Sequence, residues 1–231
     1  MNTQKKAVVR LLTLASAAAL VGTLGAGGTA SAHGTAITPP SRNFSCLDRW
    51  GGDFQNPAMA DEDPMCWQAW QANPNTMWNW NGLYQDDVAG RHEEVLKDGH
   101  LCSGGQAQGG FYNSLDAVGD WTATDTPNNF TFVNLDAADH GADYYRVYVT
   151  KQGYDPTTQP LGWDDLELVA ETGKILPGEG DPSPDPDYPG TAVSIPVSAP
   201  GRTGHHIVFM IWQASHKDQS FYSCSDVNFT G

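Results

Sequence analysis

The second half of the chain shows the two-residue periodicity that is typical of β-strands. Apolar side chains recur at every second position over residues 130–132, 144–149 and 193–197. Pro196 has no backbone N–H to donate to a neighbouring strand, so the last of these segments indicates an edge strand. Residues 207–212 are apolar throughout, as in a central, buried strand. Short strands separated by polar turns predict an all-β fold, a β-sandwich.

Residues 41–121 lack this periodicity and are rich in Trp, Gly, Asn and Asp. Asp63 and Pro64 are typical of a helix start, so a short helix is expected over residues 65–71. Long irregular regions in compact domains are usually functional or disordered, and the tryptophans argue against disorder. The sequence therefore predicts a large, partly helical loop insertion in the sandwich. The proline-rich residues 177–190 could link two domains, but the predicted strands after them need partners, which favours a surface loop.

The first 32 residues have the pattern of a secretory signal peptide. Three basic residues lie within the first ten positions, and an apolar stretch follows over residues 11–25. The small residues Ala30, Ser31 and Ala32 then form a cleavage signal. A membrane anchor is the alternative, but the stretch is only weakly apolar. We therefore expect a secreted, extracellular protein that begins at His33, with one domain over residues 33–231 and no membrane attachment after cleavage.

The charge of the chain excludes several classes of partner. The formal net charge is −15, and the first 32 residues contain three basic and no acidic residues, which leaves −18 for residues 33–231. So acidic a protein has no basic surface field with which to bind nucleic acid or anionic membranes. A neutral polymer such as cellulose or chitin meets little electrostatic penalty.

The cysteine count indicates two disulfides. An exported chain with an even number of cysteines usually pairs all of them, and three pairings are possible here. We favour a local bridge between Cys46 and Cys66 and a long-range bridge between Cys102 and Cys224. A zinc site is the alternative, but the chain has no C-x-x-C pair.

His33 is the first candidate for metal chemistry because it directly follows the predicted cleavage site. A histidine at an amino terminus offers two donors, the free amine and ring Nδ1, which can chelate one metal ion. A second histidine would complete a T-shaped, three-nitrogen site, a geometry that suits copper(II) better than zinc. Since the amine must lose a proton to bind, the affinity should fall as the pH drops.

Six other histidines are candidates for the second ligand. His140 lies in a loop just before the strand expected at residues 144–150, which is a favourable place for a fixed ligand. We interpret His92 as part of a solvated, charged segment, whereas one of His205 and His206 is expected to pack in a strand. His216 lies in a polar turn that could approach a substrate face, and His100 stays open. There is no H-E-x-x-H motif of a zinc protease. The adjacent Asp164 and Asp165 are interpreted as structural rather than as a hydrolase pair.

Several short segments resemble the bacterial lytic polysaccharide monooxygenases of auxiliary activity family ten. The resemblance covers residues 33–231 and combines a start at histidine with five matching segments, which are residues 33–34, 41–43, 137–151, 162–166 and 221–227. It implies an immunoglobulin- or fibronectin type III-like sandwich. It also implies copper-dependent oxidative cleavage of glycosidic bonds in cellulose or chitin, at C1 or at both C1 and C4. An external electron donor would be needed, with dioxygen or hydrogen peroxide as co-substrate.

Carried over position by position, the resemblance assigns roles to individual residues. His33 and His140 would hold one copper ion. Phe221 would lie beside one axial position of the metal and Ala138 beside the other. Gln219 would hydrogen-bond to bound oxygen species, although a neutral amide cannot act as a carboxylate base. Trp212 would pack in the core beneath the site.

The resemblance also implies that the irregular region forms a flat face around the metal. Trp78 and Trp80 fall within it, and exposed aromatic rings suit the apolar faces of sugars in crystalline polymers. The tryptophan-rich loop favours cellulose over chitin as the partner of a monomeric enzyme. Two other classes stay open, a non-catalytic carbohydrate-binding protein and a secreted copper carrier.

Overall fold

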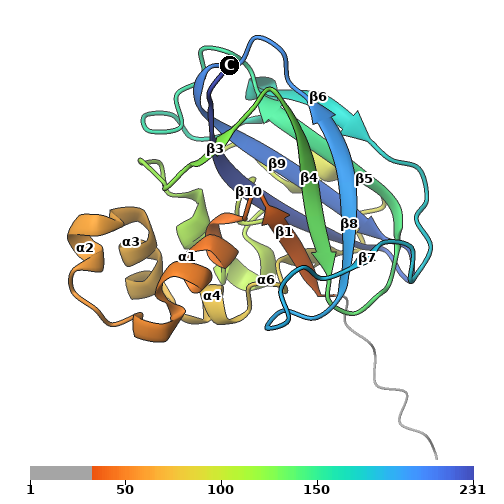
Figure 1. Ribbon diagram of the computed structural model, residues 1–231, viewed down its shortest axis with the longest axis horizontal. Helices are drawn as coiled ribbons and strands as arrows, with labels where there is room; N and C mark the ends of the chain where they lie inside the picture. The colour runs from red at the N-terminus through yellow and green to blue at the C-terminus, as the bar shows by residue number, and fades with distance from the viewer. Residues whose placement is uncertain (1–32) are drawn as a thin grey trace, which may run out of the picture.

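The computed structural model describes residues 33–231, so the predicted signal peptide and its cleavage lie outside the described residues. Two sheets pack face to face (Figure 1). The first has the order β1 (Gly34–Thr38), β4 (Asn129–Asp136), β8 (Thr191–Ser198) and β7 (Asp181–Pro182). The second has the order β2 (Tyr84–Asp86), β10 (Gln219–Phe229), β9 (Gly204–Ala214), β5 (Ala142–Thr150) and β6 (Leu166–Glu171), with β3 (Thr124–Thr126) parallel to β10. The predicted all-β sandwich is confirmed.

The space between the sheets is filled by the inward side chains of both layers. Phe132 on β4 and Ile195 on β8 meet Tyr145 on β5 and Trp212 on β9, and all four are buried. These residues are the ones that the two-residue periodicity places on one face of each strand. Pro196 lies on β8, which pairs with β4 along its whole length. On its other side β8 pairs with β7 only at Thr191 and Ala192, so this side is unpaired at Pro196, as expected for an edge.

β9 has apolar side chains on both faces because both faces are covered. Val208 and Met210 point into the sandwich, whereas Ile207, Phe209 and Ile211 belong to a second core on the other side of the same sheet. This explains why residues 207–212 are apolar without interruption. The six-stranded sheet therefore contributes one face to each of the two cores.

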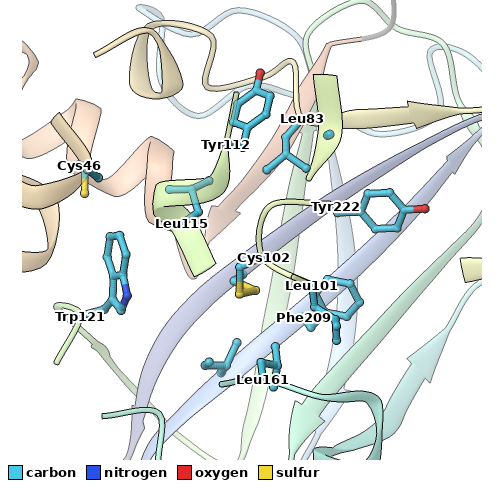
Figure 2. Packing of buried hydrophobic residues seen from close by; sticks show 14 of the residues in the cluster. Cys46, Leu83, Leu101, Cys102, Tyr112, Leu115, Trp121, Leu161, Phe209 and Tyr222 are labelled. Carbon is cyan, nitrogen blue, oxygen red and sulfur yellow. A yellow bond between two sulfur atoms is a disulfide. The ribbon is translucent and has the colours of Figure 1, made fainter. Parts of the chain in front are cut away.

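The second core is completed by the irregular region, which packs on the outer face of that sheet. Its helices are short, and α1–α4 lie together beside the sandwich (Figure 1). Figure 2 shows Leu101 and Leu161 packed near Phe209 and Tyr222 of the sheet. The helical segments are α1 (Arg42–Trp50), α2 (Met59–Glu62), α3 (Pro64–Ala72), α4 (Asn75–Trp78), α5 (His92–Val95) and α6 (Ala107–Gly110), with single turns η1 (Gly51–Asp53), η2 (Asn113–Asp116) and η3 (Trp163–Asp165).

The helix predicted at residues 65–71 is present as α3, whereas α1 was not predicted. Its first residue, Arg42, is buried and donates two hydrogen bonds to the carboxylate of Asp226 on β10, at 2.7 and 3.1 Å. A buried arginine gives no apolar signal, so hydropathy alone does not reveal that this helix packs against the sheet.

Both disulfides have the pairing that the sequence favours. Cys46–Cys66 joins α1 to α3 across a sequence separation of 20 residues. Cys102–Cys224 joins the irregular region to β10 across 122 residues (Figure 2). The second bridge therefore ties the irregular region to the sheet that it covers.

Residues 177–190 form a surface loop of the domain. β7 within this loop pairs with β8, and the ring of Tyr188 packs against Phe44 at 4.8 Å and Trp80 at 5.3 Å between centroids. These contacts agree with the prediction of a loop rather than a linker. Among residues 33–231, no helix is both long and apolar enough to cross a membrane.

Candidate metal centre at His33 and His140

The backbone of His33 is fixed on two sides. Its carbonyl accepts a hydrogen bond from the N–H of Ala137 at 2.8 Å, and the N–H of Gly34 donates to the carbonyl of Asn81 at 2.8 Å. The His33 side chain is half-buried. His33 therefore lies between the loop that follows β4 and the irregular region, and the pairing of Gly34 with Asp136 sets this register.

Gly34 is needed because the chain passes very close to the core here. A Cβ atom at this position would lie 2.4 Å from the carbonyl oxygen of Leu135 and 2.6 Å from the ring of Trp212. Trp212 stacks on Phe221 with 4.5 Å between ring centroids, and its indole N–H donates to the carbonyl of Gly141 at 3.0 Å. Trp212 thus supports the residue after His33 and the residue after His140.

The loop that carries His140 is held by the carboxylate of Asp136. This buried carboxylate accepts backbone N–H groups from Ala138 at 3.1 Å, His140 at 2.6 Å and Gly141 at 3.0 Å. Burial raises the pKa of Asp136, and the three N–H donors oppose that rise. Gly141 has φ +68°, and a Cβ there would lie 2.5 Å from the carbonyl oxygen of Ile175, so only glycine fits.

The His140 residue is held at its carbonyl and at its ring. Ser215 donates its hydroxyl to the His140 carbonyl at 2.7 Å, and the His140 ring stacks on His216 with 4.0 Å between centroids. Burial lowers the pKa of His216, with further lowering by the adjacent His140 and Lys217. The imidazole of His140 therefore has a fixed orientation.

The Nε2 atom of His140 is buried and has no hydrogen-bond partner among the described residues. Leaving a buried ring nitrogen unpaired is unfavourable unless another group satisfies it. A metal ion would use the lone pair of a neutral imidazole nitrogen. The donor set of two imidazoles and one backbone amine fits copper, so the residues present agree with the group that the resemblance implies.

β10 brings two further predicted residues to the same region. Phe221 is fully buried between Trp212 and Tyr84, whose ring centroid is 5.3 Å from that of Phe221. Gln219, two residues earlier on the same face of the strand, is also fully buried. Its amide Nε2 donates to the carboxylate of Asp86 at 3.0 Å, whereas its Oε1 has no partner. Ala138 is exposed on the loop between Asp136 and His140.

The remaining histidines have structural partners. The interpretation of His92 as solvated was wrong, since its ring is buried and its two nitrogens bond Tyr222 Oη at 3.0 Å and Tyr144 Oη at 2.7 Å. One of the pair at residues 205 and 206 packs in the strand as expected, because His206 is buried against Thr150. Nowhere in residues 33–231 do three or more His, Cys, Asp or Glu side chains form a group that could hold a metal ion. The candidate centre at His33 and His140 would use a backbone amine as its third donor.

The two predicted surface tryptophans differ in exposure. Trp78 is 46% exposed, whereas Trp80 is half-buried between Phe44 and Tyr188. Both lie just before Asn81, which contacts Gly34. The expected aromatic segment therefore borders the candidate site.

Sequence reasoning missed several residues that build the site. Asp136, Asp86 and Asn81 act through hydrogen bonds to loops or to another strand, and no local pattern announces such bonds. Gly141 is different, because a glycine directly after a candidate ligand indicates a left-handed or crowded backbone position.

The fold is a β-sandwich in which backbone hydrogen bonds hold His33 and His140 on neighbouring segments, and these two residues define a candidate mononuclear metal centre. The family model described as lytic polysaccharide mono-oxygenase, cellulose-degrading, matches residues 33–227. The chain therefore belongs to this family.

Two curated relatives are similar to most of the chain. Chitin-binding protein CbpD from Pseudomonas aeruginosa is 34% identical over 216 residues, which cover 87% of this chain and 49% of that protein. A lytic cellulose monooxygenase from Streptomyces ambofaciens is 36% identical over 226 residues, which cover 96% of this chain and 59% of that protein. The chain thus spans only about half the length of these relatives.

Solved structures match over their full length. LPMO10B from Micromonospora aurantiaca is 58% identical with a TM-score of 0.82, over 85% of this chain and 100% of that one. ScLPMO10B, solved in complex with zinc, is 57% identical with a TM-score of 0.78, over 85% and 100%. The cellulose-active CelS2, solved in complex with copper, is 29% identical with a TM-score of 0.70, over 86% and 100%.

Proposed function

We propose that this protein, once cleaved before His33 and secreted, is a monomeric, copper-dependent monooxygenase that cleaves glycosidic bonds oxidatively in crystalline polysaccharide. The observation that carries the proposal is the buried, unpaired Nε2 of His140, on a loop hydrogen-bonded to the backbone of His33. Family membership and the copper and zinc complexes of similar structures support it.

The proposed ligands are the amine and ring of His33 and the ring of His140. Copper bound there would supply the redox chemistry, with an external electron donor and with dioxygen or hydrogen peroxide as co-substrate. The chain supplies the geometry: Asp136 holds the His140 loop, and His216 holds the ring from one face.

The side chains around this site have separate proposed tasks. Phe221, packed on Trp212, would place an apolar ring beside the bound copper and limit access to it, and the small side chain of Ala138 would leave room on the His140 loop. Gln219 has a free acceptor, Oε1, because its amide nitrogen already donates to Asp86. A neutral amide accepts or donates a hydrogen bond without taking up a proton at neutral pH, so Gln219 would position rather than titrate.

Cellulose is the proposed substrate, with oxidation at C1 or at both C1 and C4. The exposed Trp78 and half-buried Trp80 border the segment that contacts Gly34, and aromatic rings stack on neutral sugar faces. One relative is named a cellulose monooxygenase and another a chitin-binding protein. Chitin is therefore the comparison substrate in every assay.

Copper binding tests the ligand set. We expect His140→Ala to weaken copper affinity by more than about 100-fold in isothermal titration calorimetry, because ligand loss should cost more than loss of a residue that supports a ligand. His100→Ala is the matched control, since His100 is half-buried and its ring bonds the carboxylate of Asp116. Tight copper binding by the His140→Ala protein would remove this residue from the site.

Product analysis tests the reaction. We expect oxidised oligosaccharides from cellulose when ascorbate is added to the copper-loaded protein, and none from the metal-free protein. Mass spectrometry that finds only unoxidised oligosaccharides would indicate a hydrolase. Binding to cellulose or chitin with no products at all would indicate a non-catalytic carbohydrate-binding protein.

A further inference from the structure

An aromatic cleft lies on the irregular region and shares no lining residue with the candidate metal centre. Its volume is about 350 Å³, which is at the lower end of the range for small-molecule sites. The cleft runs between the segment after η1 and helix α3. It is lined by Phe54, Gln55, Trp67, Trp70, Gln71 and Pro74.

The rings of this aromatic cleft form one packed group. Trp70 contacts Phe54 at 5.1 Å and Trp78 at 5.2 Å between ring centroids, and Phe54 contacts Trp78 at 5.6 Å. Trp70 is buried and supports the others, whereas Phe54 and Trp67 are half-buried and keep part of their surface open. The cleft therefore offers aromatic surface on a rigid base.

The polar groups of the cleft are neutral. Gln55 and Gln71 are exposed, and no charged side chain lines the cleft, although the chain as a whole carries 27 acidic and 12 basic residues. The indole N–H of Trp70 is buried and has no acceptor among the described residues. The side chains of its ring neighbours, Phe54 and Trp78, contain no oxygen acceptor. The lining thus suits an uncharged ligand that is rich in hydroxyl groups.

We propose that the aromatic cleft is a second carbohydrate subsite, which binds a single chain of neutral β-linked hexose. A pyranose ring would stack on Trp67 and Phe54, and its hydroxyls would bond the amides of Gln55 and Gln71.

The cleft is connected to the candidate centre through one short segment. Trp78 packs on Trp70 and Phe54 at the cleft, and Asn81, three residues later, accepts the N–H of Gly34. A chain held in the cleft would therefore anchor the protein beside the polymer that it attacks. The choice of a glucan rests on the proposed function, whereas carbohydrate binding in the cleft needs no metal.

The test is a titration of the secreted protein with cellohexaose, followed by nuclear magnetic resonance of the indole N–H signals. We expect the signals of Trp67 and Trp70 to shift. The double variant Gln55→Ala/Gln71→Ala should bind about tenfold more weakly, because two ligand hydrogen bonds are lost. Trp67→Ala should weaken binding similarly. Gln159→Ala, an exposed glutamine outside the cleft, should leave the Kd unchanged.

The same titration on the His140→Ala protein separates the two proposals. Cleft binding should persist there, even if copper binding and oxidation have failed. An unchanged Kd in the Gln55→Ala/Gln71→Ala protein, whose exposed substitutions leave the core intact, would overturn the subsite. So would shifts confined to signals near His33, or binding of a proline-rich peptide in the cleft with no binding of cellohexaose.

Discussion

At the scale of single residues, the candidate site depends on one carboxylate that is not itself a proposed ligand. Asp136 accepts three backbone N–H groups of the loop that carries His140. An asparagine has the same shape but accepts through only one oxygen, and it places an N–H against donors that need an acceptor. The position of the His140 ring is therefore decided four residues earlier in the chain.

We expect Asp136→Asn to lower the free energy of unfolding by about 2–3 kcal/mol, because hydrogen bonds to a charged group are lost. Copper affinity should fall by about 10- to 100-fold, as for other residues that orient a ligand. Denaturant unfolding and copper calorimetry measure the two effects. Asp187→Asn, in the exposed surface loop, is the control. If the free energy of unfolding fell by the expected amount while the copper affinity stayed unchanged, Asp136 would stabilise the loop without positioning His140 as a ligand.

At the scale of elements, the five longest strands (β4, β5, β8, β9 and β10) were predictable, whereas the shorter strands and most helices were not. β5 is recognisable because buried side chains alternate with less buried ones along the strand. β9 is recognisable because its side chains are buried on both faces of the sheet. α1 and α5 dock through polar residues instead: Arg42 bonds Asp226, and His92 bonds two tyrosines. The sequence pointed to His33 through its place after small residues and to His140 through the family resemblance, and both remain predicted ligands. The supporting Asp136 and Asp86 were not, because their partners are distant or are backbone atoms.

The docking of α5 predicts an acid-sensitive contact. Burial, with help from Arg146 and against the effect of Asp218, lowers the pKa of His92 to about 4, compared with 6.5 when unfolded. Below pH 6.5 the unfolded chain takes up a proton that the folded chain refuses until about pH 4. The contribution of neutral His92 is therefore fully present above pH 6.5 and is lost as the pH falls from 6.5 to 4.

Denaturant unfolding at pH 7 and pH 5 measures this effect. We expect the native protein to lose about 2 kcal/mol more than the His92→Gln protein between these values. His100→Gln serves as the reference, because His100 is not fully buried. If the His92→Gln protein showed the same pH dependence as the native one, the acid sensitivity would have another source.

At the scale of the whole molecule, the two disulfides differ in the length of chain that they enclose. Cys102–Cys224 closes a separation of 122 residues, whereas Cys46–Cys66 closes one of 20. The entropy that a cross-link removes from the unfolded chain grows with the logarithm of the loop length. The long tie should therefore contribute more stability than the short one.

We expect removal of the long bridge, as Cys102→Ser/Cys224→Ser, to lower the free energy of unfolding by about 4–5 kcal/mol. Removal of the short bridge, as Cys46→Ser/Cys66→Ser, should cost about 3 kcal/mol. Each double variant is the control for the other in the same denaturant titration. Equal losses would mean that loop length does not set the contribution of these bridges.

Because the six-stranded sheet contributes to both cores, the irregular region cannot be exchanged independently of the sheet. The irregular region packs on side chains from the outward faces of β9 and β10, which are Ile207, Phe209, Ile211 and Tyr222. A chimaera that exchanges residues 41–121 with those of a relative would put foreign helices on a native surface and leave gaps or clashes there. Such a graft needs the outward-facing residues of both strands to be exchanged together with the loop, although β9 begins only at Gly204 and β10 at Gln219, far downstream of residue 121.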